Sequence, residues 1–159
     1  MTWWVGFRRL VRFNYLRIIR LKASAHSIAL GMALGIFVGF LPIIPFQTVV
    51  VLTLALIFRA NKITAGTFTF ISNPLNLIPF YYMLFVVGRF VLPFEGVAFN
   101  PDNLAMKDMI AAGWDFFLVM TAGGVLLGVP SAVVTYFVGR WCVLTYRRRR
   151  ALRLLRNRD

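Results

Sequence analysis

Three long stretches of this sequence carry no Lys, Arg, Asp or Glu. They run from Ala23 to Phe58, from Ile63 to Gly88 and from Phe116 to Gly139. Each exceeds the roughly 20 apolar residues that cross the hydrocarbon core of a bilayer. Hydrophobic residues make up 60% of the 159-residue chain, more than a soluble fold of this size can bury. We therefore predict an all-α, polytopic integral membrane protein.

The charged residues predict how the chain is oriented in the membrane. The formal net charge is +13, and the basic residues flank the apolar runs, where they favour contact with anionic lipid headgroups and argue against nucleic-acid binding. Arginine is frequent near both termini, so we expect both termini and the basic turn from Arg59 to Lys62 on the cytoplasmic side. The segment from Arg89 to Asp115 has two basic and four acidic residues, and we expect it outside.

The same pattern predicts the domain organisation. Residues 1–22 form an amphipathic helix on the cytoplasmic face, because apolar and arginine side chains alternate with a helical period. Residues 23–146 form the membrane domain, with an outer loop at about residues 93–115. Residues 147–159 are a basic cytoplasmic tail, which we also expect to be an amphipathic helix.

The first apolar run contains a helix break in its middle. Pro42 and Pro45 interrupt it, because proline lacks an N–H and clashes with the preceding turn. The arms on either side, Ser27 to Leu41 and Phe46 to Phe58, would measure about 22 Å and about 20 Å as helices. The hydrocarbon core is about 30 Å thick. We predict a re-entrant helical hairpin that turns inside the membrane, with two thin, tilted spans as the alternative.

The second apolar run, Ile63 to Leu92, is expected to cross the membrane once as a broken helix. It is interrupted at Ser72 to Pro79, where Asn73 precedes Pro74 and is biased away from helical angles. This break begins about 14 Å from Ile63, near the midplane. The run from Phe116 to Val138 is then a regular transmembrane helix.

The two breaks are the candidate binding site. Backbone groups exposed by a break cost several kcal/mol in hydrocarbon unless protein or water surrounds them, so the breaks are expected to shelter one another at mid-depth. The prolines that set the backbone are Pro42, Pro45, Pro74 and Pro79; the candidate polar contacts are Gln47, Ser72, Asn73 and Asn76, with Thr48 nearby. Two interpretations stay open: the amides cap broken helices, or they bind a ligand between two discontinuous helices.

Three arginines are candidate partners for a phosphate group, namely Arg59, Arg89 and Arg140. Arginine suits bidentate phosphate binding. The alternative for Arg89 and Arg140 is that their side chains extend to the membrane interfaces.

A stripe of small residues, Gly31, Gly35 and Gly39, recurs every four residues. Such a stripe lies on one helix face and lets another helix approach closely. The neighbour is expected to be another helix of the same chain, with homodimerisation as the alternative.

The sequence offers little for catalysis. It has one histidine, His26, and one cysteine, Cys142, so no metal-ligand set of these residues is expected. No serine lies in a nucleophile-elbow motif. We expect no enzymatic activity, no catalytic residues and no cofactor.

Several short motifs occur in a characteristic order along the chain. They are His26–Gly31, Gly35–Gly39, Pro42–Thr48, Arg59–Asn61 and Ser72–Leu75. Together they resemble the bacterial domain-of-unknown-function family numbered 2062, over about His26 to Arg140. Phe46 precedes Gln47 where that family often has a nearby glycine, and Asn76 replaces a frequent threonine. The resemblance implies a bacterial inner-membrane protein, sometimes fused to glycosyltransferase domains, with no established activity.

These features together predict a small transporter-like or lipid-handling protein with a polar midplane site for an anionic headgroup. The alternative is a non-transporting scaffold or assembly partner for an envelope glycosyltransferase, an association that the resemblance suggests. The expected partners are membrane lipids, with a homo-oligomer possible, and no nucleic acid.

Overall fold

The computed structural model describes residues 23–71, 76–94 and 113–156, together with residues 99, 101, 107 and 110. Its helices are α2 (Ala25–Gly39), α3 (Gln47–Ile57), α4 (Lys62–Thr69), α5 (Leu77–Val91) and α7 (Trp114–Arg156). No strand occurs among these residues, so the all-α prediction is confirmed. The amphipathic helix predicted for residues 1–22 lies outside the described residues.

Helix α2 begins at a side-chain cap and ends ahead of a proline. The Ser24 hydroxyl accepts a hydrogen bond from the Ser27 N–H at 3.1 Å, which satisfies one of the amides that a helix N-terminus leaves unpaired. The helix ends at Gly39, because Pro42 cannot donate to the carbonyl of Val38. A turn follows, in which the Ile44–Pro45 peptide bond is cis, and α3 begins at Gln47.

The basic turn between α3 and α4 is compact and local in origin. The N–H of Ala60 donates to the Ala55 carbonyl at 2.8 Å and that of Arg59 donates to Leu56 at 3.2 Å, the pair of bonds that defines a Schellman motif. Arg59 has a φ of 51°, as the residue after a helix C-cap often does. The Asn61 side chain then caps α4 by accepting from the N–H groups of Ile63 and Thr64.

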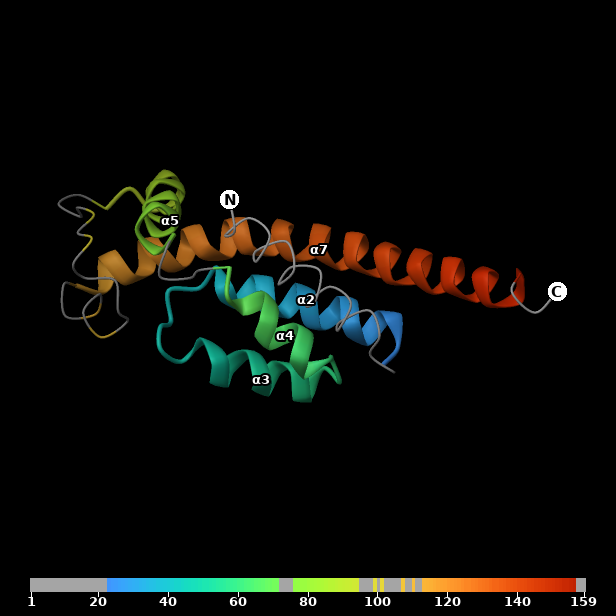
Figure 1. Cartoon of the computed structure of the whole chain (residues 1–159). Coiled ribbons are helices and arrows are strands. Elements are labelled where there is room, and N and C mark those ends of the chain that lie inside the picture. Colours follow the sequence, from blue (N-terminus) through green and yellow to red (C-terminus); the bar gives the residue numbers. More distant parts are fainter. Residues whose placement is uncertain are drawn as a thin grey trace, which may run out of the picture.

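Helix α4 returns alongside α2, and α3 lies against both, as Figure 1 shows. The glycine stripe of α2 faces α4. The position of a Cβ at Gly31 is occupied by Thr64, and that at Gly35 lies 2.7 Å from the Cβ of Phe68. The glycines therefore let the backbones of two parallel helices of the same chain approach closely.

Helix α7 is the longest of the described helices. Its 43 residues measure about 64 Å, and it runs the length of the structure in Figure 1. It continues through Pro130 and past residue 147, where a separate basic tail was expected, to Arg156. Arginine, leucine and alanine are strong helix formers, which explains why the basic segment extends the helix. Within the described residues, α7 alone is long and apolar enough to cross a membrane.

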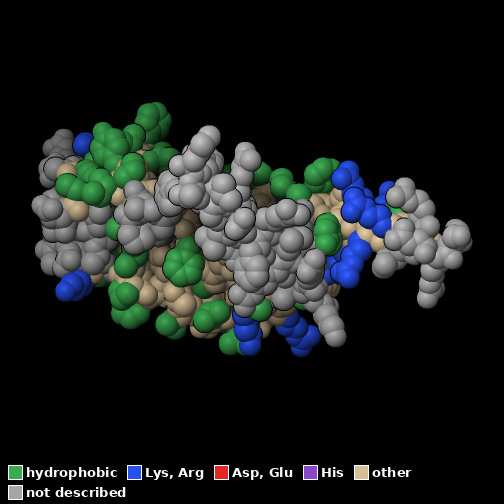
Figure 2. Space-filling view, viewed as in Figure 1, with side chains coloured by type: hydrophobic (Ala, Val, Ile, Leu, Met, Phe, Trp, Pro, Cys, Tyr) green, Lys and Arg blue, Asp and Glu red, His purple; other side chains and the backbone are tan. Residues whose placement is uncertain are grey.

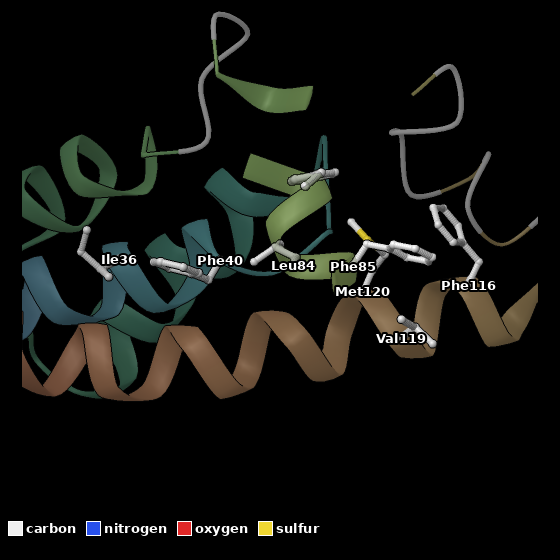
Figure 3. Close-up of a cluster of buried hydrophobic side chains, with 8 residues drawn as sticks. Ile36, Phe40, Leu84, Phe85, Phe116, Val119 and Met120 are labelled. Carbon is white, nitrogen blue, oxygen red and sulfur yellow. The ribbon is translucent and has the colours of Figure 1, made fainter. Parts of the chain in front are cut away.

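Helix α5 crosses the first part of α7 at two glycines. A Cβ added at Gly88 would collide with the Val119 carbonyl oxygen, and one added at Gly123 would collide with that of Leu84. The surrounding core joins α2, α5 and α7 (Figure 3). Its buried residues are Ile36, Phe40, Tyr81, Leu84, Phe85, Phe116, Val119 and Met120.

Large apolar side chains are also exposed on the outside of α3, α5 and α7, and many are visible as green patches in Figure 2. They include Leu56, Ile57, Ile78, Val86, Phe90, Val133, Val134, Phe137 and Trp141. Exposed apolar surface of this extent is typical of contact with lipid or protein rather than with water.

The close crossing of α5 and α7 predicts that adding one methyl group destabilises the protein at Gly123 but not at Gly66. We expect Gly123→Ala to lower stability by about 1–3 kcal/mol, because the Leu84 backbone cannot move aside as a flexible side chain can. The control is Gly66→Ala on α4, where no atom lies within 4 Å of the new Cβ; it should be neutral or stabilising by up to about 1 kcal/mol. Thermal unfolding in detergent micelles measures both, and equal unfolding temperatures would contradict the close crossing.

A candidate functional site at the junction of two helix breaks

The ends of the two broken helices lie side by side. At Gly39, the last residue of α2, a Cβ would lie 2.6 Å from Cγ2 of Ile71 and 2.9 Å from the carbonyl oxygen of Thr69. The rings of Phe40 and Phe80 are 5.0 Å apart. The chain therefore leaves α2, leaves α4 and enters α5 at one place, which we call the junction.

Gln47 closes the first break. Its side chain is 8% exposed, and its Nε2 donates to the Leu41 carbonyl at 3.0 Å. In a continuous helix that carbonyl would accept from residue 45, but Pro45 has no N–H. The Leu41 carbonyl also accepts from the N–H of Ile43 at 2.9 Å. These two donors replace the hydrogen bond that proline removes.

Asn76 spans the second break in the same manner. Its Nδ2 donates to the Ile71 carbonyl at 2.8 Å. Ser72, Asn73 and Pro74, which complete the candidate set, lie outside the described residues. Pro79 was expected to belong to the break, but α5 has already begun at Leu77. The first turn of a helix tolerates proline because its N–H groups have no intrahelical acceptor.

The two helices that follow the breaks begin without a side-chain cap. Neither α3, with Phe46 at the N-cap, nor α5, with Asn76 there, has a side-chain hydrogen bond to its first amides. Neither has an acidic residue in its first turn. Each N-terminus therefore presents amide donors and the positive end of the helix dipole.

Tyr81 is a residue of the junction that sequence reasoning missed. It is fully buried, and its hydroxyl is a buried side-chain atom with no hydrogen-bond partner among the described residues. Leaving a buried donor unsatisfied costs about 1–3 kcal/mol. The sequence does place this tyrosine close to the break in an uncharged run. A buried tyrosine hydroxyl usually has a hydrogen-bond partner, so Tyr81 could have been included among the candidate polar residues.

The three candidate arginines lie away from the junction, and all are exposed. Arg59 follows the far end of α3. Arg89 is near the far end of α5, with its guanidinium carbon 5.9 Å from the centre of the Phe85 ring. Arg140 is about 24 Å along α7 from Gly124, the glycine that packs on Phe40. The structure therefore does not bring these cations to the amides.

Metal binding finds no support in the described part of the chain, where no group of three His, Cys, Asp or Glu side chains could hold an ion. Thr48 is exposed at the start of α3. The described side-chain hydrogen bonds of the two breaks join amides to backbone carbonyls.

The contact of Gln47 predicts a structural effect. Replacing Gln47 by Leu keeps the size of the side chain and removes the donor to the Leu41 carbonyl, so we expect a loss of about 1–3 kcal/mol. Thr48→Val is the matched control on the neighbouring exposed position. Thermal unfolding of both variants in the same detergent is the measurement, and a Gln47 variant as stable as the control would show that the bond is dispensable.

Comparison with known proteins gives a family and no activity. The family model for an uncharacterized protein conserved in bacteria, DUF2062, matches residues 8–152. No curated protein and no solved structure matches the chain. The match confirms the resemblance of the ordered motifs and extends beyond them at both ends. The chain therefore belongs to the bacterial family DUF2062.

Proposed function

We propose that this chain is a multi-pass protein of the bacterial inner membrane that handles lipid, with a polar site at mid-depth for an anionic headgroup. The observation that carries the proposal is the buried hydroxyl of Tyr81, which has no hydrogen-bond partner among the described residues, on α5, a helix that follows a break and begins without a side-chain cap. Buried polar groups normally have partners, and a ligand that accepts hydrogen bonds would supply one here.

Distances along α7 give the depth of its residues in the membrane. With Trp114 at the outer interface, Gly124 lies about 15 Å inward and Arg140 about 39 Å inward. The hydrocarbon core is about 30 Å thick, so Gly124 is near the midplane. Phe40, at the tip of the α2–α3 hairpin, packs on Gly124. This supports a hairpin that enters from the basic side and turns inside the membrane.

The remaining helices support two crossings. Helix α4 runs parallel to α2 up to the junction, and α5 starts there and crosses the first part of α7, with Leu84 against Gly123 and Gly88 against Val119. Together α4, the break and α5 form one crossing, and α7 forms the return. Arg147 donates to the carbonyl of Ala23 at 2.6 Å, so both ends of the described chain meet on one side, which we assign to the cytoplasm.

The helix ends define the chemistry of the ligand. The N-termini of α3 and α5 attract a negative group, and the Tyr81 hydroxyl donates to it. The C-terminus of α4 ends at the same junction and offers carbonyl acceptors. A headgroup that combines a phosphate with hydroxyl or amine groups matches both kinds of helix end.

One observation favours the alternative, a non-transporting scaffold. The amides of Gln47 and Asn76 donate to the backbone of their own breaks, as a purely structural role requires. Under this alternative the junction is packing, and the basic end of the molecule recruits a partner such as an envelope glycosyltransferase.

Transbilayer lipid movement separates the two functions. The purified chain is reconstituted in vesicles with a tail-labelled phosphatidylglycerol, and loss of fluorescence to an impermeant reductant reports lipid that reaches the outer leaflet. We expect the wild type to accelerate this movement and Tyr81→Phe to slow it several-fold, because the donor to the headgroup is gone. Tyr82→Phe is the matched control, since Tyr82 is the exposed neighbour.

The same variants guard against a folding artefact. Removing an unsatisfied buried hydroxyl should leave stability unchanged or raise it by about 1 kcal/mol. Slower lipid movement in Tyr81→Phe at an unchanged unfolding temperature would therefore result from the lost headgroup contact and not from unfolding. A wild-type protein that does not accelerate lipid movement supports the scaffold.

Cysteine labelling tests the topology. In a Cys142→Ser background, we expect Lys62→Cys to react with an impermeant maleimide from the cytoplasmic side only and Trp114→Cys from the outer side only. Ile43→Cys, at the hairpin tip, should react from neither side because it lies at mid-depth. Labelling of Ile43→Cys from the outer side would mean that α2 and α3 each cross the membrane, which contradicts the re-entrant hairpin.

A further inference from the structure

A second polar cluster lies at the opposite end of α2 from the junction. The hydroxyl oxygen of Tyr136 is 2.8 Å from Nδ1 of His26 and accepts a hydrogen bond from Nη1 of Arg140 at 3.5 Å. His26 is in the first turn of α2, and the other two residues are one turn apart on α7. A Cβ at Gly139 would lie 2.7 Å from the Met32 sulfur, so the two helices are closely packed here.

The cluster carries positive charge without an acidic neighbour. Among the described residues the single acidic side chain is Asp115, about 38 Å from Arg140 along α7. The first turn of α2 also has no acidic residue, so its dipole adds to the positive potential. Figure 2 shows Lys and Arg side chains gathered at this end of the molecule, over the C-terminal part of α7 and below it. An anion must therefore come from outside the described chain.

The geometry points to a binding site for one phosphate group, formed by Arg140 and His26 and positioned by Tyr136. Arg140 presents a guanidinium that can bind two phosphate oxygens at once. When the Tyr136 hydroxyl donates to Nδ1, neutral His26 carries its proton on Nε2 and can donate it to the same anion. Tyr136 is a positioning residue, because its oxygen fixes both donors.

The depth of the cluster identifies the source of the phosphate. Arg140 lies about 39 Å from Trp114 along α7, which is just beyond a core of about 30 Å. This is the level of the lipid phosphates in the leaflet on the basic side, so the source is a lipid headgroup. The inference rests on the membrane orientation proposed above but not on the junction, and the site would hold lipid in a scaffold as well as in a lipid carrier.

Lipid titration tests the site in the full chain. The detergent-solubilised protein is titrated with phosphatidylglycerol, and native mass spectrometry measures the bound fraction. We expect Arg140→Gln to weaken the tightest binding event about tenfold, as the loss of a charge-assisted hydrogen bond does. Arg150→Gln is the control, since Arg150 is an exposed arginine ten residues further along the same helix. Tyr81→Phe should leave this event unchanged, which separates it from the junction.

Two further measurements test the roles of Tyr136 and Arg140 and the source of the phosphate. Tyr136→Phe should weaken binding at an unchanged unfolding temperature, and Arg140→Lys should restore it only in part because the two-oxygen contact is lost. Inorganic phosphate alone is titrated in parallel: binding that depends on Arg140 but occurs without lipid would assign the site to a soluble phosphate. Equal losses in Arg140→Gln and Arg150→Gln would mean that lipid binds by overall charge, and the site would be overturned.

Discussion

The structure depends on satisfying backbone groups where proline interrupts a helix. Pro45 removes the donor that the Leu41 carbonyl would use, and the Gln47 side chain supplies a replacement at 3.0 Å. Asn76 makes the corresponding bond to Ile71 at 2.8 Å. In a bilayer each such bond matters more than in water, because no solvent can take its place. The ends of α2 and α4 lie together at the junction, where a Cβ at Gly39 would lie 2.6 Å from Cγ2 of Ile71 and 2.9 Å from the Thr69 carbonyl oxygen.

Close packing of glycines makes that arrangement possible. The α2 stripe brings α4 near enough for Gly39 to contact the end of α4, and the Gly88–Gly123 crossing brings α5 onto α7. The Schellman turn at Arg59 and the Asn61 cap reverse the chain within a few residues, so α4 starts level with the beginning of α2. Since the other described helices are short, the position of the junction is set by α7, the one among them that continues past it in both directions.

The sequence predicts the breaks well because proline and glycine act locally. Pro42 and Pro45 separate α2 from α3, and Arg59 to Lys62 form the turn that their charge suggested. Other features depend on neighbours in space and could not be foreseen. The partner of a buried hydroxyl such as that of Tyr81 depends on which residues surround it, and the separation of Arg59, Arg89 and Arg140 from the amides depends on the directions of three different helices. Helix propensity could have indicated the extension of α7 past residue 147, because arginine, leucine and alanine favour a helix.

The two proposed sites share α2 and are held at a fixed distance by it. His26 is at the beginning of α2 and Phe40 directly follows its end, about 21 Å apart along the axis. Contacts with α4 and α7 at Gly31, Gly35 and Gly139 prevent α2 from sliding, because any shift would bring side chains into backbone. One phosphate cannot reach both sites at once, so a lipid held at Arg140 and a headgroup at the junction are either two molecules or two stages of one passage. With α2 locked, coupling between them would come from the lipid that moves rather than from a helix that transmits a change.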